Sequence, residues 1–158
     1  MKNRAIRVYA DTSVFGGVFD AEFKKGSQRF FDLVRAGRFQ LVISALVEDE
    51  LDNAPGNVKD FYAEMAEYAE LILLSPEAYA LQEAYIKANI LTDKCEEDAL
   101  HVALASVSDC AIIVSWNFKH IVNFQKIPLY NAVNMALGYK TIAIHSPMEV
   151  TIDDQEKI

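Results

Sequence analysis

Long hydrophobic runs and cysteine clusters are both missing from this 158-residue chain. No segment approaches the roughly 18 apolar residues that a membrane-spanning helix needs, and the N-terminus, MKNRAIRVYAD, lacks the apolar stretch of a signal peptide. The two cysteines, Cys95 and Cys110, form no CxxC pair and no Cys/His cluster with zinc spacing. We therefore expect a soluble cytoplasmic protein without membrane contacts, in which both cysteines are small buried side chains.

Positive charge is also scarce, since 15 Lys and Arg face 23 Asp and Glu, for a formal net charge of −8. This argues against a protein that coats nucleic acid, which needs a large basic surface. It does not exclude an enzyme that meets phosphate groups through metal ions, because carboxylates must gather to hold such ions. Disorder is excluded for most of the chain, because hydrophobic residues make up 52% of it and charged residues only 24%.

The glycine-based motifs of several enzyme classes are absent too. The sequence contains no GxGxxG of dinucleotide-binding folds, no GxxxxGK[ST] of P-loop proteins and no GxSxG of serine hydrolases. Gly16 and Gly17 suggest a flexible turn rather than a phosphate-binding loop. A catalytic site in this chain therefore has to use other side chains.

Five short runs rich in β-branched residues alternate with longer segments that have the apolar spacing of helices. The strand-like runs are Ile6–Ala10, Leu41–Ser44, Leu71–Leu74, Ala111–Ser115 and Thr141–Ile144. The helical stripes are Phe30–Val34, Phe61–Tyr68, Leu81–Ala88, Leu100–Val107 and Val133–Leu137, the last stopped by Gly138. This alternation predicts an α/β fold with a mainly parallel central sheet and helices on both faces. No linker interrupts it, so we expect one domain over residues 1–150 and a flexible tail over residues 151–158.

Polar side chains follow several of these strands, at the edge of a parallel sheet where ligands bind. They are Asp11-Thr12-Ser13 after the first run, Ser44 with Glu48, Asp49 and Glu50 after the second, and Ser115-Trp116-Asn117 after the fourth. The helix before the fourth strand opens with Glu96-Glu97-Asp98, and its first two acids have positions that the helix dipole favours. Carboxylate and amide oxygens suit a hard divalent cation such as Mg²⁺ or Mn²⁺, which can activate water and polarise a phosphodiester.

Each of these residues also has a structural explanation. Asp11 is placed to cap the helix that follows it, and Glu50 lies in the run VEDEL, where a solvated helix face is the default. Asp98 heads an apolar stripe, so its carboxylate must be paired, cap the helix or bind a ligand. Asn117 is of a type that forms turns, and His101 is typical of a hydrogen-bonded histidine in a core or groove.

Four segments occur in a specific order along the chain: VYADTSVF, ISALVEDEL, EEDALHVALAS and IIVSWNFKHI. Together they resemble the PIN-domain family of metal-dependent ribonucleases, in particular the VapC-like toxins of toxin–antitoxin pairs. The first is similar to an opening strand that ends in Asp-Thr/Ser-Ser/Asn, and the second to a Ser-x5-Glu-Leu element. The third is similar to a central helix that begins with Asp-Ala, and the fourth to a strand followed by Thr/Ser-x-Asp/Asn. The resemblance runs from the first strand to about Ile144.

This resemblance implies a three-layer α/β/α sandwich and a metal-dependent endoribonuclease that acts on single-stranded or structured RNA. Its catalytic residues would be Asp11, Glu50, Asp98 and Asn117. The three acids would bind Mg²⁺ or Mn²⁺, oriented by the hydroxyl residues Thr12, Ser13 and Ser44. Proteins of this type are commonly homodimers and are silenced by an antitoxin tail that enters the groove, so we expect both partners here.

Departures from the family pattern leave alternatives open. Many members have Asp where this chain has Asn117, which offers an oxygen without charge and so favours a one-metal mechanism. The acidic balance leaves few basic residues for RNA: Lys119 and His120 are candidates, with a solvated surface as the alternative. A PIN-like binding or assembly module with weak or no nuclease activity is therefore the second hypothesis. A phosphoacceptor receiver domain is a weaker third, because Thr12 rather than a second acid follows Asp11.

Overall fold

Buried β-branched and apolar residues form a five-stranded sheet in the computed structural model, which describes residues 5–151. The strands are β1 (Ile6–Ala10), β2 (Phe39–Ser44), β3 (Ala69–Ile72), β4 (Ile112–Val114) and β5 (Ala143–His145). Their order in the sheet is β3-β2-β1-β4-β5, and every neighbouring pair is parallel. The parallel central sheet predicted from the sequence is confirmed.

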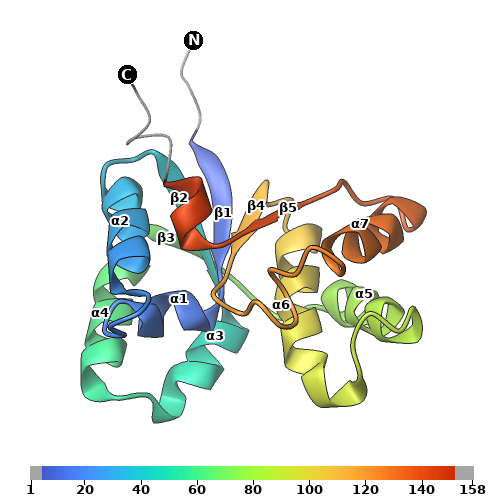
Figure 1. Ribbon diagram of the computed structural model, residues 1–158, viewed down its shortest axis with the longest axis horizontal. Coiled ribbons are helices and arrows are strands. Elements are labelled where there is room, and N and C mark those ends of the chain that lie inside the picture. The colour runs from blue at the N-terminus through green and yellow to red at the C-terminus, as the bar shows by residue number, and fades with distance from the viewer. Residues whose placement is uncertain (1–4, 152–158) are drawn as a thin grey trace.

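Helices cover both faces of this sheet (Figure 1). On one side lie α1 (Thr12–Gly17), α2 (Lys24–Arg35), α3 (Ala45–Glu50), α4 (Gly56–Ala66) and α8 (Pro147–Val150). On the other side lie α5 (Pro76–Lys87), α6 (Glu96–Val107) and α7 (Ile127–Ala136). Two short 3-10 helices are η1 (Leu51–Asn53), which follows α3, and η2 (Asp93–Cys95), which leads directly into α6. The predicted three-layer α/β/α sandwich is therefore confirmed.

Capping residues set where several helices begin and end. The side chains of Ser44 and Ser75 accept hydrogen bonds from the backbone N–H groups three residues on, at 3.3 and 3.1 Å, and so cap α3 and α5. Pro76 then occupies the first turn of α5, where no N–H is needed. Gly138, just beyond α7, has a φ of +87°, a left-handed conformation that ends the helix as the sequence predicts.

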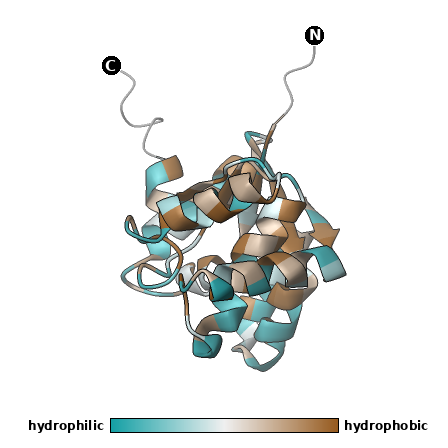
Figure 2. Ribbon diagram, turned by 90° about the vertical axis from the view of Figure 1, so that its right-hand side faces the viewer, coloured by the Kyte–Doolittle hydropathy of each residue, from teal (hydrophilic) through white to brown (hydrophobic). Residues whose placement is uncertain are grey.

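The core lies around β1 and along α6. Val8, Tyr9 and Ala10 have no exposed surface, and every residue of α6 from Ala99 to Ser106 is buried. Figure 2 views the molecule from the side of α5, α6 and α7, and hydrophobic and hydrophilic residues interleave along these helices. Because α6 is buried over most of its length, its polar side chains, His101 among them, have to find partners inside the protein.

The edge strand is where sequence and structure differ most. The sequence predicts a strand over Leu71–Leu74, whereas β3 covers Ala69–Ile72 and pairs with β2 from Leu41↔Ala69 to Ser44↔Ile72. Leu73 is 71% exposed, because the chain has left the sheet before it. The bounds of an edge strand are hard to predict from apolar residues alone, because such a strand is paired on one side only and its side chains are only partly buried.

The two ends of the chain are described in part. Thr151 is buried, and its hydroxyl donates to the carbonyl oxygens of Pro147 and Met148 in α8, at 3.1 Å in both cases. The rest of the predicted tail, residues 152–158, lies outside the described residues, as do residues 1–4. Within residues 5–151, no helix combines the length and the apolar composition needed to cross a bilayer.

The single tryptophan, Trp116, fixes the loop after β4 against α1 and α2. Its Nε1–H donates to Ser27 Oγ at 2.8 Å, and its ring stacks on Phe23 with centroids 4.4 Å apart. A Cβ atom added to Gly17 would lie 2.7 Å from Trp116 Nε1 and 2.6 Å from Ser27 Oγ. The flexible turn suggested for Gly16 and Gly17 is therefore wrong: both lie in α1, and Gly17 leaves room for the indole.

We expect Gly17→Ala to destabilise the fold and to disturb Trp116. The added methyl group must displace the indole or Ser27, which costs about 1–3 kcal/mol, as overpacking of a core usually does. Gly16→Ala is the matched control: nothing lies within 4 Å of its Cβ position, so stability should be unchanged or slightly higher. Urea unfolding followed by Trp116 fluorescence measures both variants, and equal stability of the two would contradict the close packing.

Candidate active site

The candidate site lies where β1 and β4 end next to each other at the carboxyl edge of the sheet. β1 pairs with β2 on one side and with β4 on the other, so the order of strands reverses here. Ligands bind at such switch points in parallel α/β sheets. Asp11 follows β1 and Ser115 follows β4, and the backbone N–H of Asp11 donates to the carbonyl oxygen of Val114 at 3.2 Å. The two strand ends thus bring Asp11 and Ser115 together.

Asp11 is a buried carboxylate whose two oxygens are oriented by serine side chains. Its Oδ1 accepts from the backbone N–H of Ser13 at 3.1 Å, which caps α1, and from the Ser13 hydroxyl at 2.6 Å. Its Oδ2 accepts from the Ser115 hydroxyl at 2.6 Å. Burial raises the pKa of the Asp11 carboxyl, and the charge of Glu50 adds to this, whereas His101 and the serine hydroxyls counteract only part of it. A bound cation would stabilise this desolvated charge.

Glu50, the last residue of α3, is held by a histidine from the opposite helical layer. His101 Nε2 donates to Glu50 Oε1 at 2.7 Å, and the Thr12 hydroxyl donates to the same oxygen. On the other side of the ring, Nδ1 shares a hydrogen bond of 2.7 Å with the Tyr9 hydroxyl, which lies 2.8 Å from Ser44 Oγ. His101 is thus the hydrogen-bonded histidine that the sequence suggests, and it fixes the position of Glu50.

Each partner in the His101–Glu50 pair favours the charged form of the other. Burial alone would raise the pKa of Glu50, but the hydrogen bond and the charge of His101 lower it to about 2. Burial alone would likewise lower the pKa of His101, but the hydrogen bond to Glu50 and the charges of Asp11 and Glu50 raise it. His101 therefore places a positive charge in direct contact with Glu50, whereas it acts on Asp11 only at longer range.

Glu97 joins this site, although the sequence suggests only a first-turn acid for it. Glu97 is exposed and lies against Glu50, and its hydrogen bond to that carboxyl group raises the pKa of Glu97. Glu97 precedes His101 by four residues, so both lie on the same face of α6. This spacing is the feature of the sequence that could have pointed to Glu97, once His101 is known to contact Glu50.

Asp98 does not lie with Asp11 and Glu50 in a common metal-sized cluster. Its carboxylate lies instead with Cys95 and His120, and the ligand atoms of these three side chains are all within 4.8 Å of one another. Within residues 5–151, this is the only group of three or more such side chains close enough to hold a metal ion together. Asp98 still interacts electrostatically with His101, so it borders the site, and its role beside Asp11 stays a prediction.

Asn117 stabilises the loop after β4 through its side-chain oxygen Oδ1. The family resemblance implies that this same oxygen completes the metal site. Asn117 Oδ1 accepts from the backbone N–H groups of Lys119 and His120, at 3.2 and 2.9 Å, as turn residues do. Ser115, which the sequence places after the fourth strand without a role, donates to Asp11 and accepts from the backbone N–H of Asn117 at 2.9 Å. Ser115 is the serine of the predicted Thr/Ser-x-Asp/Asn element, and that motif could have identified it.

Residues 7–119, more than half of the chain, match the family model of the PIN domain. The chain belongs to the PIN domain family. The match starts in β1 and ends two residues beyond Asn117, so this PIN domain holds Asp11, Glu50 and Asp98 within the matched region. The family predicted from the four sequence segments is therefore confirmed. The comparison with curated proteins finds no match.

Among solved structures, this PIN domain is similar to a crystal structure of VapBC2 from Rickettsia felis bound to a DNA fragment from their promoter. The similarity covers 89% of this chain and 98% of that chain, with a TM-score of 0.60. Because only 13% of the residues are identical, the likeness supports the fold and carries no assignment of site residues.

PIN domains typically bind divalent metal ions, and the donors at this sheet edge suit such an ion. Asp11 and Glu50 supply carboxylate oxygens, the ligands that Mg²⁺ and Mn²⁺ prefer, and Glu97 lies against Glu50. Burial raises the pKa of Asp11 and the contact with Glu50 raises the pKa of Glu97, so a bound cation would stabilise the charged forms of both. The donor chemistry of this edge therefore fits a hard divalent cation.

We expect His101 to titrate above the ordinary histidine pKa of about 6.5, and to titrate at a lower pH in Glu50→Gln than in the wild type. The substitution removes the Glu50 charge, which together with Asp11 raises the pKa of His101, whereas the burial that lowers this pKa remains. NMR shifts of the His101 ring across the pH range measure this. Glu48→Gln is the matched control, because Glu48 lies on the same helix and accepts from Tyr62 instead. An unchanged His101 pKa in Glu50→Gln would contradict the ion pair.

The same pair makes stability depend on pH. Because the folded-state pKa of His101 is raised, its contribution is fully present below the unfolded value of about 6.5 and is lost as the pH rises through the folded value. Because the pKa of Glu50 is lowered to about 2, its contribution is present above the unfolded value of about 4.5 and is lost as the pH falls towards 2. The stability difference between wild type and Glu50→Gln should therefore be largest between about pH 4.5 and 6.5.

Proposed function

We propose that this PIN domain is a divalent-metal-dependent endoribonuclease that cleaves single-stranded or structured RNA. The observation that carries the proposal is the buried carboxylate of Asp11 at the switch point of the sheet, with Glu50 near it. A carboxylate that is costly to desolvate, yet is fixed at both oxygens by Ser13 and Ser115, is organised to hold a ligand. Family membership adds support, since PIN domains are generally nucleases.

In this proposal Asp11, Glu50 and Asp98 bind the metal ion, directly or through water, and Asn117 completes the site. For Asp98 this requires the carboxylate to turn away from Cys95. A bound Mg²⁺ or Mn²⁺ supplies an activated water and stabilises negative charge on the phosphate. Asp11 follows β1, whereas Glu50 ends α3 and Asp98 lies in the first turn of α6, so the carboxylates that would hold the ion are carried by regular elements of the fold.

Three hydroxyl residues orient these carboxylates in different ways. Ser13 donates directly to Asp11 Oδ1, and Thr12 donates to Glu50 Oε1. Ser44 does not touch a carboxylate and acts through the Tyr9 hydroxyl, which lies between it and His101. The positioning roles proposed for all three thus rest on side-chain contacts at or near the site.

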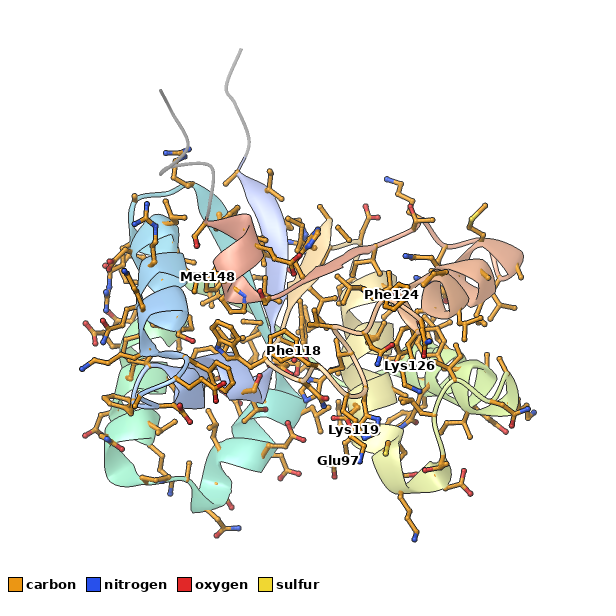
Figure 3. All side chains as sticks on the ribbon, viewed as in Figure 1. Glu97, Phe118, Lys119, Phe124, Lys126 and Met148 are labelled. Carbon is orange, nitrogen blue, oxygen red and sulfur yellow. The ribbon has the colours of Figure 1, made fainter. Side chains whose placement is uncertain are left out.

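An exposed aromatic and basic loop beside Asn117 supports RNA as the substrate. Phe118 is 50% exposed, and Lys119 next to it is exposed too. Figure 3 shows Phe118 near the middle of the molecule, between the two helical layers, with Lys119 and Glu97 just below it. We propose that an unstacked base packs on Phe118 and that Lys119 meets a phosphate. His120 stays a candidate for RNA contact, although its ring lies against Cys95.

A toxin role is proposed from the family resemblance and from the solved structure that this chain resembles. That structure is VapBC2 from Rickettsia felis bound to a DNA fragment from their promoter. By analogy, we propose that an antitoxin protein silences this chain and that the chain forms a homodimer in the cytoplasm. Co-expression with the product of any short reading frame next to the gene, followed by co-purification, tests the antitoxin partner.

A PIN-like binding or assembly module with weak or no catalysis is the alternative, and two observations favour it. Asp98 lies with Cys95 and His120, and Asn117 Oδ1 is engaged by backbone N–H groups. Calorimetric titration with Mn²⁺ separates the two proposals. A folded protein that binds no Mn²⁺ at millimolar metal would favour the module over the nuclease.

We expect cleavage of mixed single-stranded RNAs to require Mg²⁺ or Mn²⁺, to stop in EDTA, and to fall more than about 100-fold in Asp11→Asn and Asp98→Asn. Asn caps helices as well as Asp does, so α1 should persist in Asp11→Asn. Asp49→Asn is the matched control, because it makes the same change at an exposed position of α3. Thermal unfolding of every variant checks that the fold is intact.

Two outcomes of this assay would contradict the nuclease proposal. Cleavage that is equal in wild type and Asp11→Asn, purified identically, and that persists in EDTA would reveal a contaminating ribonuclease. Metal-dependent cleavage that Asp11→Asn and Asp98→Asn leave unchanged would place the catalytic centre elsewhere in the chain.

We expect Phe118→Leu to weaken RNA binding by about 5- to 150-fold, which corresponds to the ~1–3 kcal/mol of one stacked base. Leucine keeps an apolar side chain beside Trp116 but removes the flat face. Phe124→Leu is the matched control, because Phe124 is 83% exposed and lies farther toward α7 (Figure 3). Fluorescence anisotropy of labelled RNA, with both changes made in the Asp11→Asn background, measures binding without cleavage. Equal losses in both variants would contradict a specific stacking site.

A further inference from the structure

A second group of metal-binding side chains lies beside the carboxylate site. Cys95 ends η2, Asp98 lies in the first turn of α6, and His120 lies in the loop after β4. Their ligand atoms are all within 4.8 Å of one another, and Cys95 Sγ lies 3.4 Å from His120 Nε2. We propose that Cys95, Asp98 and His120 bind a divalent transition-metal ion of the Zn²⁺ class.

The separations suit a tetrahedral ion. With bonds of about 2.3 Å to sulfur and about 2.0 Å to nitrogen, tetrahedral geometry places those two ligand atoms about 3.5 Å apart. The Cys95 sulfur and the His120 nitrogen are already 3.4 Å apart. The third donor, the Asp98 carboxylate, lies within 4.8 Å of both, so a modest side-chain rotation completes three ligands. A water molecule would take the fourth position.

The donor set selects against the hard cation of the neighbouring carboxylates. Thiolate and imidazole ligands favour Zn²⁺ and similar ions, whereas Mg²⁺ and Mn²⁺ prefer oxygen. The His120 ring presents Nε2 to the sulfur, whereas its Nδ1 is buried and has no hydrogen-bond partner within residues 5–151. The two sites therefore differ in ligand chemistry even though both can use Asp98.

The backbone holds the two softer donors in place before any ion binds. The backbone N–H of His120 donates to Asn117 Oδ1 at 2.9 Å, and its carbonyl oxygen accepts from the Tyr130 hydroxyl at 2.8 Å. The backbone N–H of Cys95 donates to the carbonyl oxygen of Thr92 at 2.9 Å. These contacts fix two elements that are 25 residues apart in sequence, which lowers the cost of assembling a site.

The cluster is open to solutes. Cys95 and His120 line a surface cavity of about 470 Å³ that also reaches Asp93 and Lys126. An ion and its bound water can enter from this side without crossing the carboxylate site. The cavity thus supplies the entry path that a metal site needs.

Sharing of Asp98 gives the second site a regulatory consequence, which rests on the proposed nuclease function. An ion of the Zn²⁺ class on Cys95 and His120 holds Asp98 away from Asp11 and Glu50. The catalytic ion then loses one of its three acids. We therefore expect Zn²⁺ to inhibit cleavage that depends on Mn²⁺, through Cys95.

Cobalt titration tests the site itself, because Co²⁺ adopts zinc-like geometry and its bond to a thiolate gives a near-ultraviolet charge-transfer band. The full chain, reduced and in excess Mg²⁺, should bind one equivalent of Co²⁺ with this band. Cys95→Ser should abolish the band, and His120→Gln should weaken Co²⁺ binding more than about 100-fold, beyond the usual loss for a residue that only orients a ligand. Cys110→Ser and His145→Gln are the matched controls, since neither residue belongs to the cluster.

Two results would overturn the site: a wild-type protein without the thiolate band, or a band that survives Cys95→Ser. The inhibitory consequence is measured separately, as the Zn²⁺ concentration that halves Mn²⁺-dependent RNA cleavage. Cys95→Ser should need at least about tenfold more Zn²⁺ than wild type, and equal sensitivity would overturn the inhibition while the cobalt result stands. A wild-type protein that cleaves no RNA would remove the nuclease proposal, and the cobalt spectrum would still decide the site.

Discussion

The buried hydrogen-bond chain from Ser44 through Tyr9 and His101 to Glu50 connects the three layers of the protein. Its members come from β2, β1, α6 and α3, so the chain joins the sheet to a helix on each of its faces. Tyr9 and His101 are buried, and a polar group that lost its partner there would cost about 1–3 kcal/mol. Because Ser44 caps α3 and Glu50 ends it, this chain fixes both ends of the helix. The place of the Glu50 carboxylate therefore follows from the core and not from a surface loop.

The two central carboxylates differ in what neutralises them. Glu50 bonds directly to His101, and its pKa falls to about 2. Asp11 receives hydroxyl groups from Ser13 and Ser115, which orient its oxygens but carry no charge, so burial still raises its pKa. The desolvation of this carboxylate is a cost to folding that a bound ion can offset. Asp11 is accordingly the residue around which a cation site would form.

Strand ends could be predicted from the sequence because polar residues directly follow apolar runs, and this located Asp11, Ser44 and the Ser115–Asn117 loop. The edge strand β3 was placed two residues too late, because its apolar run continues into the exposed Leu73. Glu97 was missed because its contact with Glu50 depends on how α6 packs against α3, which no local pattern encodes. The pairing of Cys95 with His120 was missed for the same reason: no zinc-type spacing relates them.

Asp98 lies between two sets of donors that differ in hardness. On one side are the carboxylates of Asp11 and Glu50, and on the other are the sulfur of Cys95 and the imidazole of His120. A side chain in the first turn of a helix can change rotamer without moving the backbone, so the ion that is present can decide which side it serves. If both sites operate, the identity of the available metal would select between a complete catalytic centre and one that lacks an acid. Because Asp98 lies with Cys95 and His120 in this structure, a hard ion at Asp11 and Glu50 has to turn the Asp98 carboxylate toward it.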